Sequence, residues 1–294
     1  MAFSSMPLIA PGGRLSIVAA SGPFDREKFD QGLELLRGRY DVVVAPEAFD
    51  TFRYLAGRDE RRRASLQRSL DDRELPVVMA ARGGYGAMRL LTDLRLDRPA
   101  TLVGFSDVTA LHLAFQARGW RSVHGPVVTQ LGTQPSAVLT RLFDLLEGKP
   151  VGPLLGADTL HPGLVEGPLI GGNLALVASL VGTRFMPPLD GAVLLLEDIG
   201  ERPYRLDRLW TQLVLSGALE RVAGVVLGEF TDCEEKDATF TSAEVLRDLV
   251  GGLGVPALAG LHIGHGAVNQ PVTLGARVRL DATAKRLEFL EGLA

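Results

Sequence analysis

The sequence predicts an α/β protein with two domains. In its first half, short and continuously apolar runs alternate with helical segments, as expected for a parallel sheet that helices cover on both faces. Residues 148–167 are then rich in Gly and Pro and lack periodicity, which indicates a boundary. The second half ends in several short β-like segments. We therefore expect a Rossmann-like domain over residues 1–150, a linker over 151–164 and an α+β, barrel-like domain over 165–294.

In the first half, the apolar runs predict strands at 15–20, 41–45, 76–81 and 101–105. Asp25 can cap a helix after the first strand, because the apolar residues that follow recur on one face and Gly38 provides a stop. A polar helix is expected near 59–70, with further helices after the glycine turn at 82–86 and after Asp107. Functional loops of such sheets lie at the carboxyl ends of the strands.

The second half opens with Gly171-Gly172-Asn173, which we expect to start an apolar helix. Strands are expected at 192–196 and 224–227, and helices near 204–216 and 243–250. Further β-like segments occupy 255–258, 272–274, 276–280 and 286–290. The pattern predicts no specific order of strands for this domain.

Composition excludes several classes of protein. The chain has 294 residues, of which 46% are hydrophobic, so it can bury a core and is not a disordered chain. The net charge of −4 comes from interspersed charges without a basic stripe, which argues against a nucleic-acid partner. The start of the chain lacks the features of a signal peptide, and no apolar run is long enough to span a bilayer. We expect a soluble, cytoplasmic protein.

Ser106 is the first candidate for chemistry. It lies in Gly104-Phe105-Ser106-Asp107, directly after a predicted buried strand and before a predicted helix. A sharp turn of this kind exposes a nucleophilic hydroxyl next to the free amides of a helix N-terminus. The match to the nucleophile motif G-x-S-x-G is partial, because Val108 stands in the place of the last Gly. Capping of the helix by Ser106 or Asp107 is the structural alternative.

A second turn after a strand contains three glycines, in the segment Arg82–Gly86. Such a turn can direct its amides at one point and bind an anion or an oxyanion, or it can simply be tight. Its spacing does not match the nucleotide-binding motifs.

Five histidines are available, and His265 is the one in a small-residue loop, Gly264-His265-Gly266. His112 lies among apolar neighbours in a predicted helix and is expected to be a packing residue, whereas His124 could line a site and His161 falls in the linker. His262 and His265 form H-x-x-H, but no carboxylate is close in sequence, so we predict no metal site.

Two further groups are possible site residues. Glu197, Asp198 and Glu201 follow a predicted core strand, where acids either lie on the surface or belong to a site. Cys233, the single cysteine, is flanked by acids that disfavour a thiolate, and it cannot form an intramolecular disulfide.

Six short motifs occur along the chain in the order found in one known family. They are RGGYG at 82–86, GFSD at 104–107, HGP at 124–126, GGNL at 171–174, LEDIGERPYRLDR at 196–208 and GHGAVNQPVTLG at 264–275. Together they resemble the LD-carboxypeptidase family of serine peptidases, which also contains the microcin C self-immunity peptidases. The resemblance extends over nearly the whole chain, from Ile17 to about Leu280.

The resemblance implies a site between two domains, with a Ser–His–Glu triad. The nucleophile matches Ser106 in the N-terminal domain, the base matches His265, and the acid matches Glu197, which is preferred over its acidic neighbours. The amides of Gly84 and Asp107 are then expected to form the oxyanion hole. The resemblance implies a homodimer, and the chemistry requires no metal or organic cofactor.

The implied reaction is release of the terminal D-alanine from murein tetrapeptide, at an L,D bond, during peptidoglycan recycling. Arg82 or Asn173 could recognise the carboxylates of this peptide. The immunity branch instead cleaves a peptidyl-nucleotide, and its members offer an aromatic residue near the inter-domain loop, whereas residues 148–167 here contain none. Two other functions stay open: a phosphate- or nucleotide-dependent enzyme that uses the glycine turn, and a non-catalytic protein that binds a small ligand.

Overall fold

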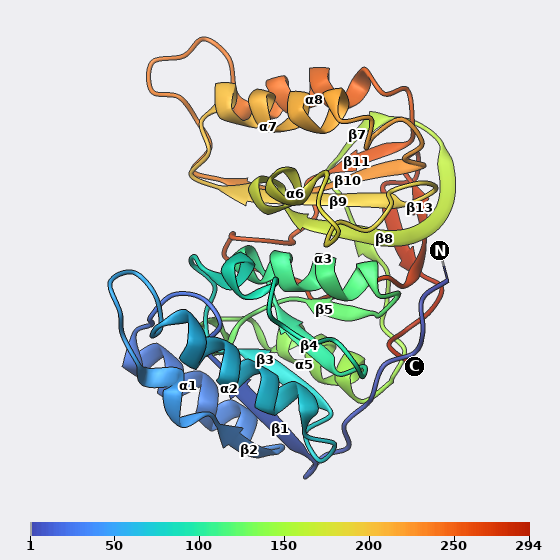
Figure 1. The fold of residues 1–294 in the computed structure, drawn as a ribbon. Coiled ribbons are helices and arrows are strands. Elements are labelled where there is room, and N and C mark those ends of the chain that lie inside the picture. Colours follow the sequence, from blue (N-terminus) through green and yellow to red (C-terminus); the bar gives the residue numbers. More distant parts are fainter. Residues whose placement is uncertain (1) are drawn as a thin grey trace.

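The computed structural model describes residues 2–294. Two sheets lie one above the other, with helix α3 (Thr109–Ala117) between them (Figure 1). Among residues 2–294, no helix is both long and apolar enough to cross a membrane.

Five parallel strands form most of the first sheet. They are β1 (Arg14–Val18), β2 (Asp41–Val44), β3 (Val77–Ala80), β4 (Thr101–Gly104) and β5 (Ser122–His124), in the spatial order β5-β4-β3-β1-β2. The helices of this half are α1 (Arg26–Arg37), α2 (Asp59–Asp71), α3, α4 (Val128–Leu131) and α5 (Ser136–Leu146).

Alternate residues of these strands face two different cores, as the continuously apolar runs predict. Val77 and Met79 of β3 pack in the core that includes residues of α1 and α5. Val78 and Ala80 pack in the core that includes residues of α2 and α3. Each face of the parallel sheet is therefore buried against helices.

The second sheet has eight strands in the order β6-β14-β13-β8-β9-β10-β11-β7. Its parallel centre consists of β8 (Leu164–Asn173), β9 (Val193–Ile199), β10 (Gly224–Thr231) and β11 (Ala257–Ala259). Antiparallel strands flank it, namely β7 (Asp158–His161) on one side and β13 (Arg277–Asp281), β14 (Arg286–Phe289) and β6 (Leu154–Leu155) on the other.

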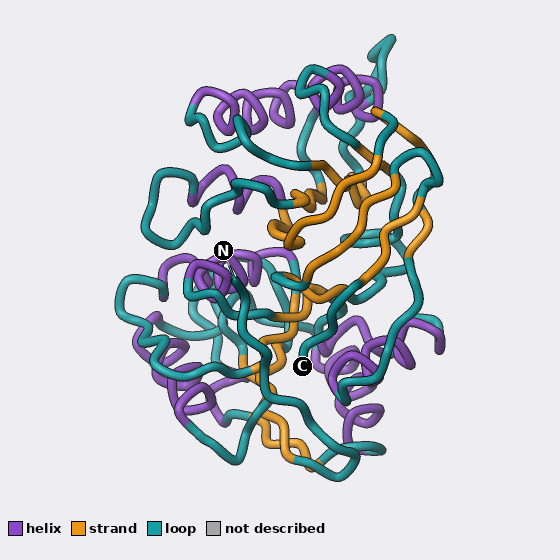
Figure 2. Tube along the Cα trace, turned by 90° about the vertical axis from the view of Figure 1, so that its right-hand side faces the viewer, coloured by secondary structure: helices purple, strands orange, loops and turns teal. Residues whose placement is uncertain are grey.

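This second sheet curls into a half-barrel, and its strands lie above those of the first sheet in Figure 2. Residues of α6 (Leu174–Leu180), α7 (Pro203–Leu215) and α8 (Ser242–Gly251) pack in the core on one of its faces. The other face closes on a separate apolar core, to which Leu195 of β9, Val226 of β10 and Leu280 of β13 contribute. The predicted fold class, a parallel α/β half followed by a barrel-like α+β half, is confirmed.

One strand ties the two halves together. β12 (Val272–Leu274) belongs to the C-terminal part of the chain but pairs with β5, so that it completes the first sheet as a sixth, antiparallel strand. The loop that carries His265 leads directly into β12. The pairing therefore fixes this loop against the sheet that carries Ser106.

The local predictions differ from the structure in three places. The segment 151–164 contains β6 and β7, which hydrogen-bond within the second sheet, so it is more ordered than its Gly and Pro content suggests. Only a 3-10 turn, Ala87–Leu90, follows the glycine turn where a helix was expected. Gly171-Gly172-Asn173 ends β8, and α6 begins one residue later. The division into residues 1–150 and 165–294 stays a prediction.

Candidate active site

Ser106 lies at the carboxyl end of β4, in a strained turn. It begins a 3-10 turn, Ser106–Val108, and its φ of 61° is a value that residues other than glycine rarely adopt. A Cβ on Gly83 would lie 2.9 Å from the Ser106 Cβ, so the glycine turn approaches the serine more closely than any side chain would permit. This arrangement is the strand–turn–helix geometry expected of a nucleophilic serine.

His265 reaches the same place from the other half of the molecule. Its loop lies between β11 and β12, and its ring packs on the Phe105 ring with 4.7 Å between centroids. Phe105 directly precedes Ser106 in the sequence. The contact therefore brings His265 beside the serine turn, with 12% of its side chain exposed.

Glu197 lies behind His265. It projects from β9, is fully buried, and its Oε2 lies 2.7 Å from the His265 Nδ1. Because a carboxylate only accepts, Nδ1 carries the proton of this hydrogen bond and Nε2 of a neutral ring is left as the basic nitrogen. Burial raises the pKa of Glu197, and the hydrogen bond from His265 opposes this shift.

The two acids next to Glu197 have other partners. Asp198 accepts hydrogen bonds from the amides of Ile199 and Ala175, at 2.8 and 2.9 Å. Glu201 pairs with Arg205 at 3.4 Å, within α7 and its preceding turn. Of the three acids considered from the sequence, Glu197 is the one that contacts His265.

Asn173 and Arg82, the predicted substrate-binding residues, occupy different environments. Asn173 is buried; its side-chain oxygen caps α6 at the Leu176 amide, 3.2 Å away, and its nitrogen donates to Asp198 at 2.7 Å. Its amide group thus already has partners within the protein. Arg82 is exposed, and its guanidinium donates to the carbonyl of Pro23 beside the glycine turn.

The two residues predicted for the oxyanion hole flank the serine turn. Gly84 has a φ of 112° within the glycine turn, one residue after the contact with Ser106. Asp107 follows Ser106, and its buried carboxylate accepts from the Ala87 amide at 2.7 Å. This bond joins the serine turn to the glycine turn, so that both segments keep a fixed relative position.

The remaining histidines of the first half are internal. His112 is buried and bonds to Ser122 and to the Gly104 carbonyl, both at 2.8 Å, which fits its predicted packing role. Since a carbonyl only accepts, the proton lies on Nε2, and burial lowers the pKa of His112 to about 4. Burial also lowers the pKa of His124 well below its usual value, and its ring lies 5.8 Å from that of Phe105.

Cys233 has the properties of an inert thiol. It is buried, and burial raises the pKa of its thiol to about 11. A neutral thiol at physiological pH is a poor nucleophile.

The sequence did not reveal two sets of contacts around the His265 loop. His262 Nδ1 lies 2.8 Å from Oε1 of Glu229, so the two histidines of H-x-x-H bond to different glutamates. Gln134 accepts from the Asn269 amide at 2.9 Å and holds the far end of the loop. Glu229 comes shortly after the predicted strand at 224–227, as Glu197 comes after the predicted strand at 192–196, which is the one signal that could have identified it.

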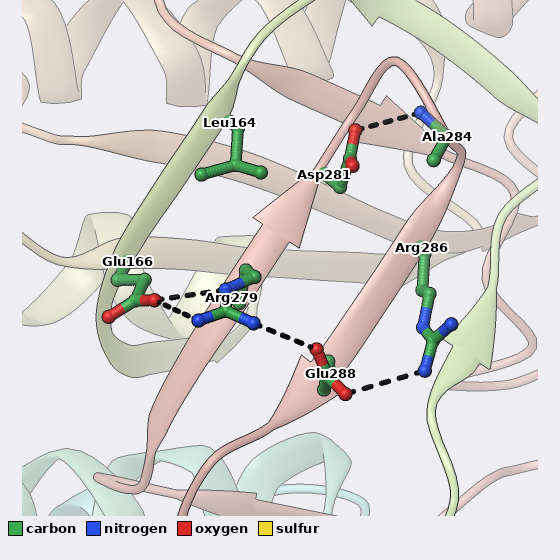
Figure 3. A pocket seen from close by; sticks show the side chains of 7 residues that line it. All are labelled: Leu164, Glu166, Arg279, Asp281, Ala284, Arg286 and Glu288. Atoms are coloured by element: carbon green, nitrogen blue, oxygen red, sulfur yellow. Dashed lines mark hydrogen bonds and ion pairs between the residues drawn. The ribbon is translucent and has the colours of Figure 1, made fainter.

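A separate charged surface lies on β8, β13 and β14 (Figure 3). Arg279 pairs with Glu166 at 2.7 Å and with Glu288 at 3.4 Å, and these partners lie directly opposite it in the strand register. Arg286 adds a further ion pair to Glu288. These cross-strand pairs stabilise a solvated sheet face, and none of the predicted site residues lies among the side chains that line this pocket.

Family models and a curated relative both match this chain over most of its length. Residues 15–125 match the model of the LD-carboxypeptidase N-terminal domain, and residues 166–280 match that of the LD-carboxypeptidase C-terminal domain. The murein tetrapeptide carboxypeptidase of Pseudomonas aeruginosa is 33% identical over 93% of this chain and 95% of its own.

Two solved structures have the same fold. The muramoyltetrapeptide carboxypeptidase from Oxalobacter formigenes superposes with a TM-score of 0.83 at 28% identity, over 93% of this chain and 97% of that one. The immunity protein MccF, in complex with glutamyl sulfamoyl guanosine, gives a TM-score of 0.88 at 21% identity, over 98% of this chain and 99% of that one. With both family models matched in order along the sequence, the chain belongs to the LD-carboxypeptidase family.

Proposed function

We propose that the protein is a serine LD-carboxypeptidase that releases the terminal D-alanine of murein tetrapeptide. The observation that carries this proposal is the hydrogen bond of 2.7 Å between Glu197 and His265, with the His265 ring packed on the residue before Ser106. A buried carboxylate, an imidazole and a serine in a strained turn are the parts of a hydrolytic triad.

The proposed reaction follows from these positions. His265 Nε2 takes the proton of the Ser106 hydroxyl as its oxygen attacks the scissile carbonyl, and later gives a proton to the leaving amine. Glu197 keeps the proton on Nδ1 and stabilises the imidazolium. The amides of Gly84 and Asp107 are the proposed donors to the oxyanion, where the loss of one donor typically lowers turnover by about 10²–10³-fold. Water then hydrolyses the acyl-enzyme with His265 as base.

The choice of substrate rests on the relatives. The Pseudomonas aeruginosa protein is named for murein tetrapeptide, and the Oxalobacter formigenes protein for the muramoyl form of the same peptide. Arg82 is the proposed contact for a substrate carboxylate, because it is exposed beside the glycine turn. For Asn173 we propose an indirect part in the site, through its bonds to Asp198 and α6. A cytoplasmic location and a homodimer stay predictions.

A peptidyl-nucleotide is the second candidate substrate. The microcin C7 self-immunity protein of Escherichia coli is 25% identical over 99% of this chain and 98% of its own. The lower identity and the lack of aromatic residues in 148–167 make us prefer the murein peptide.

A substrate panel tests the proposal. The purified protein is given murein tetrapeptide with terminal D-alanine, the same peptide with terminal L-alanine, and an aminoacyl sulfamoyl adenosine. We expect release of D-alanine alone. Cleavage of the sulfamoyl adenosine without D-alanine release would assign the protein to the immunity function, and inertness toward all three would favour a ligand-binding protein.

A further inference from the structure

The loop that carries His265 contacts a second histidine–carboxylate pair. His262, three residues earlier, bonds through its Nδ1 to Glu229 Oε1 at 2.8 Å, just as the Nδ1 of His265 bonds to Glu197 Oε2 at 2.7 Å. The two glutamates come from the neighbouring parallel strands β10 and β9. One short loop is thus held by carboxylates from two adjacent strands.

A β-bulge brings Glu229 to this position. Leu227 pairs with Leu196 and Phe230 pairs with Asp198, so that Gly228 and Glu229 of β10 lie opposite the single residue Glu197 of β9. A bulge of this kind re-aims a side chain, and such bulges are frequent beside active sites. Here the bulge positions Glu229 so that β9 and β10 each direct one carboxylate at the same loop.

Glu229 contacts the loop on both sides of His265. Its amide donates to the carbonyl of Ile263 at 2.9 Å, and its Oε1 bonds to His262. Its Oε2 is buried against the backbone of Gly266, where a Cβ would lie 1.4 Å from that oxygen. Any side chain at position 266 would therefore displace Glu229. The carboxylate thus contacts residues 262 and 266, which lie on either side of His265 in the sequence.

A glycine-flanked histidine needs such a support. Gly264 has a φ of 121°, and glycines on both sides of His265 give the free backbone more freedom than other residues would. A misplacement of about 1 Å in a reacting group can lower the rate by about 10²-fold. The bond to Glu197 orients the ring, but it does not restrain the start of the loop.

We propose that Glu229 and His262 are positioning residues, which hold the loop so that His265 stays aligned with Ser106. The proposal rests on the function proposed above. His262 is suited to the test, because 65% of its side chain is exposed and its replacement should leave the core intact.

His262→Ala is expected to lower kcat by about 10-fold, with KM changed by less than about twofold, because alignment and not binding is lost. His262→Asn should restore most of the rate, since its Nδ2 can donate from nearly the position of the imidazole Nδ1. The double variant His262→Ala/Glu229→Ala should be no slower than the slower single variant, as expected for residues that act as one unit. His161→Ala, on β7, is the matched control and should keep the wild-type rate.

Labelling of Ser106 by a fluorophosphonate supplies a readout that does not depend on the murein substrate. If wild type is labelled but releases no D-alanine, the proposed function fails while the labelling rates still test the positioning role. A slower rate in His262→Ala that His262→Asn restores supports the proposal. Equal labelling and equal kcat in wild type and His262→Ala, or an equal loss in the Ala and Asn variants, would overturn it.

Discussion

Replacement of Glu197 by Gln separates the electrostatic role of this residue from its role in folding. Glu197 is fully buried, and its carboxylate bonds to Nδ1 of His265 at 2.7 Å. When His265 takes the serine proton, two opposite charges face each other within about 4 Å. At an effective dielectric constant near 20, their attraction is about 4 kcal/mol, which is about 10³-fold in rate. The amide can also impose the wrong tautomer, so we expect kcat to fall by about 10³–10⁴-fold.

Stability should change in the opposite direction. Because burial raises the pKa of Glu197, the folded state holds this proton to higher pH than the unfolded state does. The carboxyl therefore favours folding at acidic pH, and above its folded pKa the buried charge reduces the stability. At pH 8, the free energy of unfolding of Glu197→Gln should equal or exceed that of wild type.

The assay combines D-alanine release with urea unfolding at pH 8. Glu220→Gln, an exposed acid in the same half, serves as the matched control and should keep full activity. Activity of Glu197→Gln within tenfold of wild type would show that the charge of Glu197 does not stabilise the imidazolium of His265. A loss of activity that accompanies a clear loss of stability would show that Glu197 is needed for folding instead.

Three other changes have defined outcomes. Gly83→Ala should lower kcat by about 10²-fold, because the new Cβ would lie 2.9 Å from the Cβ of Ser106. Gly152→Ala is the control and should keep the wild-type kcat, because apart from its chain neighbours no atom lies within 4 Å of the new Cβ. Steady-state kinetics of both variants measure the difference. Asp198→Ala should reduce the free energy of unfolding by about 1–3 kcal/mol in urea titrations, because it leaves the buried side-chain amide of Asn173 and an amide in the first turn of α6 without an acceptor. Unchanged stability would show that these hydrogen bonds do not stabilise the fold. The pKa of His112 is about 4 in the folded state and about 6.5 in the unfolded state, so protonation of this residue should cost wild type about 3 kcal/mol of stability as pH falls from 6.5 to 4. His112→Gln should lose less stability over the same range. Parallel plots of the free energy of unfolding against pH for the two proteins would show that His112 is not the group responsible.

The parts of the fold that local sequence determines were predictable. Apolar runs identified β1, β3 and β4, because both faces of a parallel strand are buried. The position of Ser106 just after β4 was predictable for the same reason, since the turn is continuous in sequence with the strand. The structure adds the positive φ of Ser106 and its close approach to Gly83, and no residue pattern specifies either of them.

The contacts between distant segments were not predictable from residue patterns alone. Glu197, Asp198 and Glu201 were equivalent as acids after a strand, and the structure separates them because the His265 loop passes over Glu197 while the start of α6 lies on Asp198. The pairing of β12 with β5 joins residues 148 positions apart at Val272 and His124, and a three-residue strand gives no signal of its partner.

Ser106 is the proposed nucleophile of this LD-carboxypeptidase, and every step of the proposed reaction depends on it. The most direct measurement is D-alanine release from murein tetrapeptide by wild type and by Ser106→Ala, with the fold of both checked by circular dichroism. We predict release by wild type and loss of at least about 10³-fold in the variant. Release by Ser106→Ala at a rate near that of wild type would rule out Ser106 as the nucleophile, and no release by the folded wild type would rule out the proposed activity.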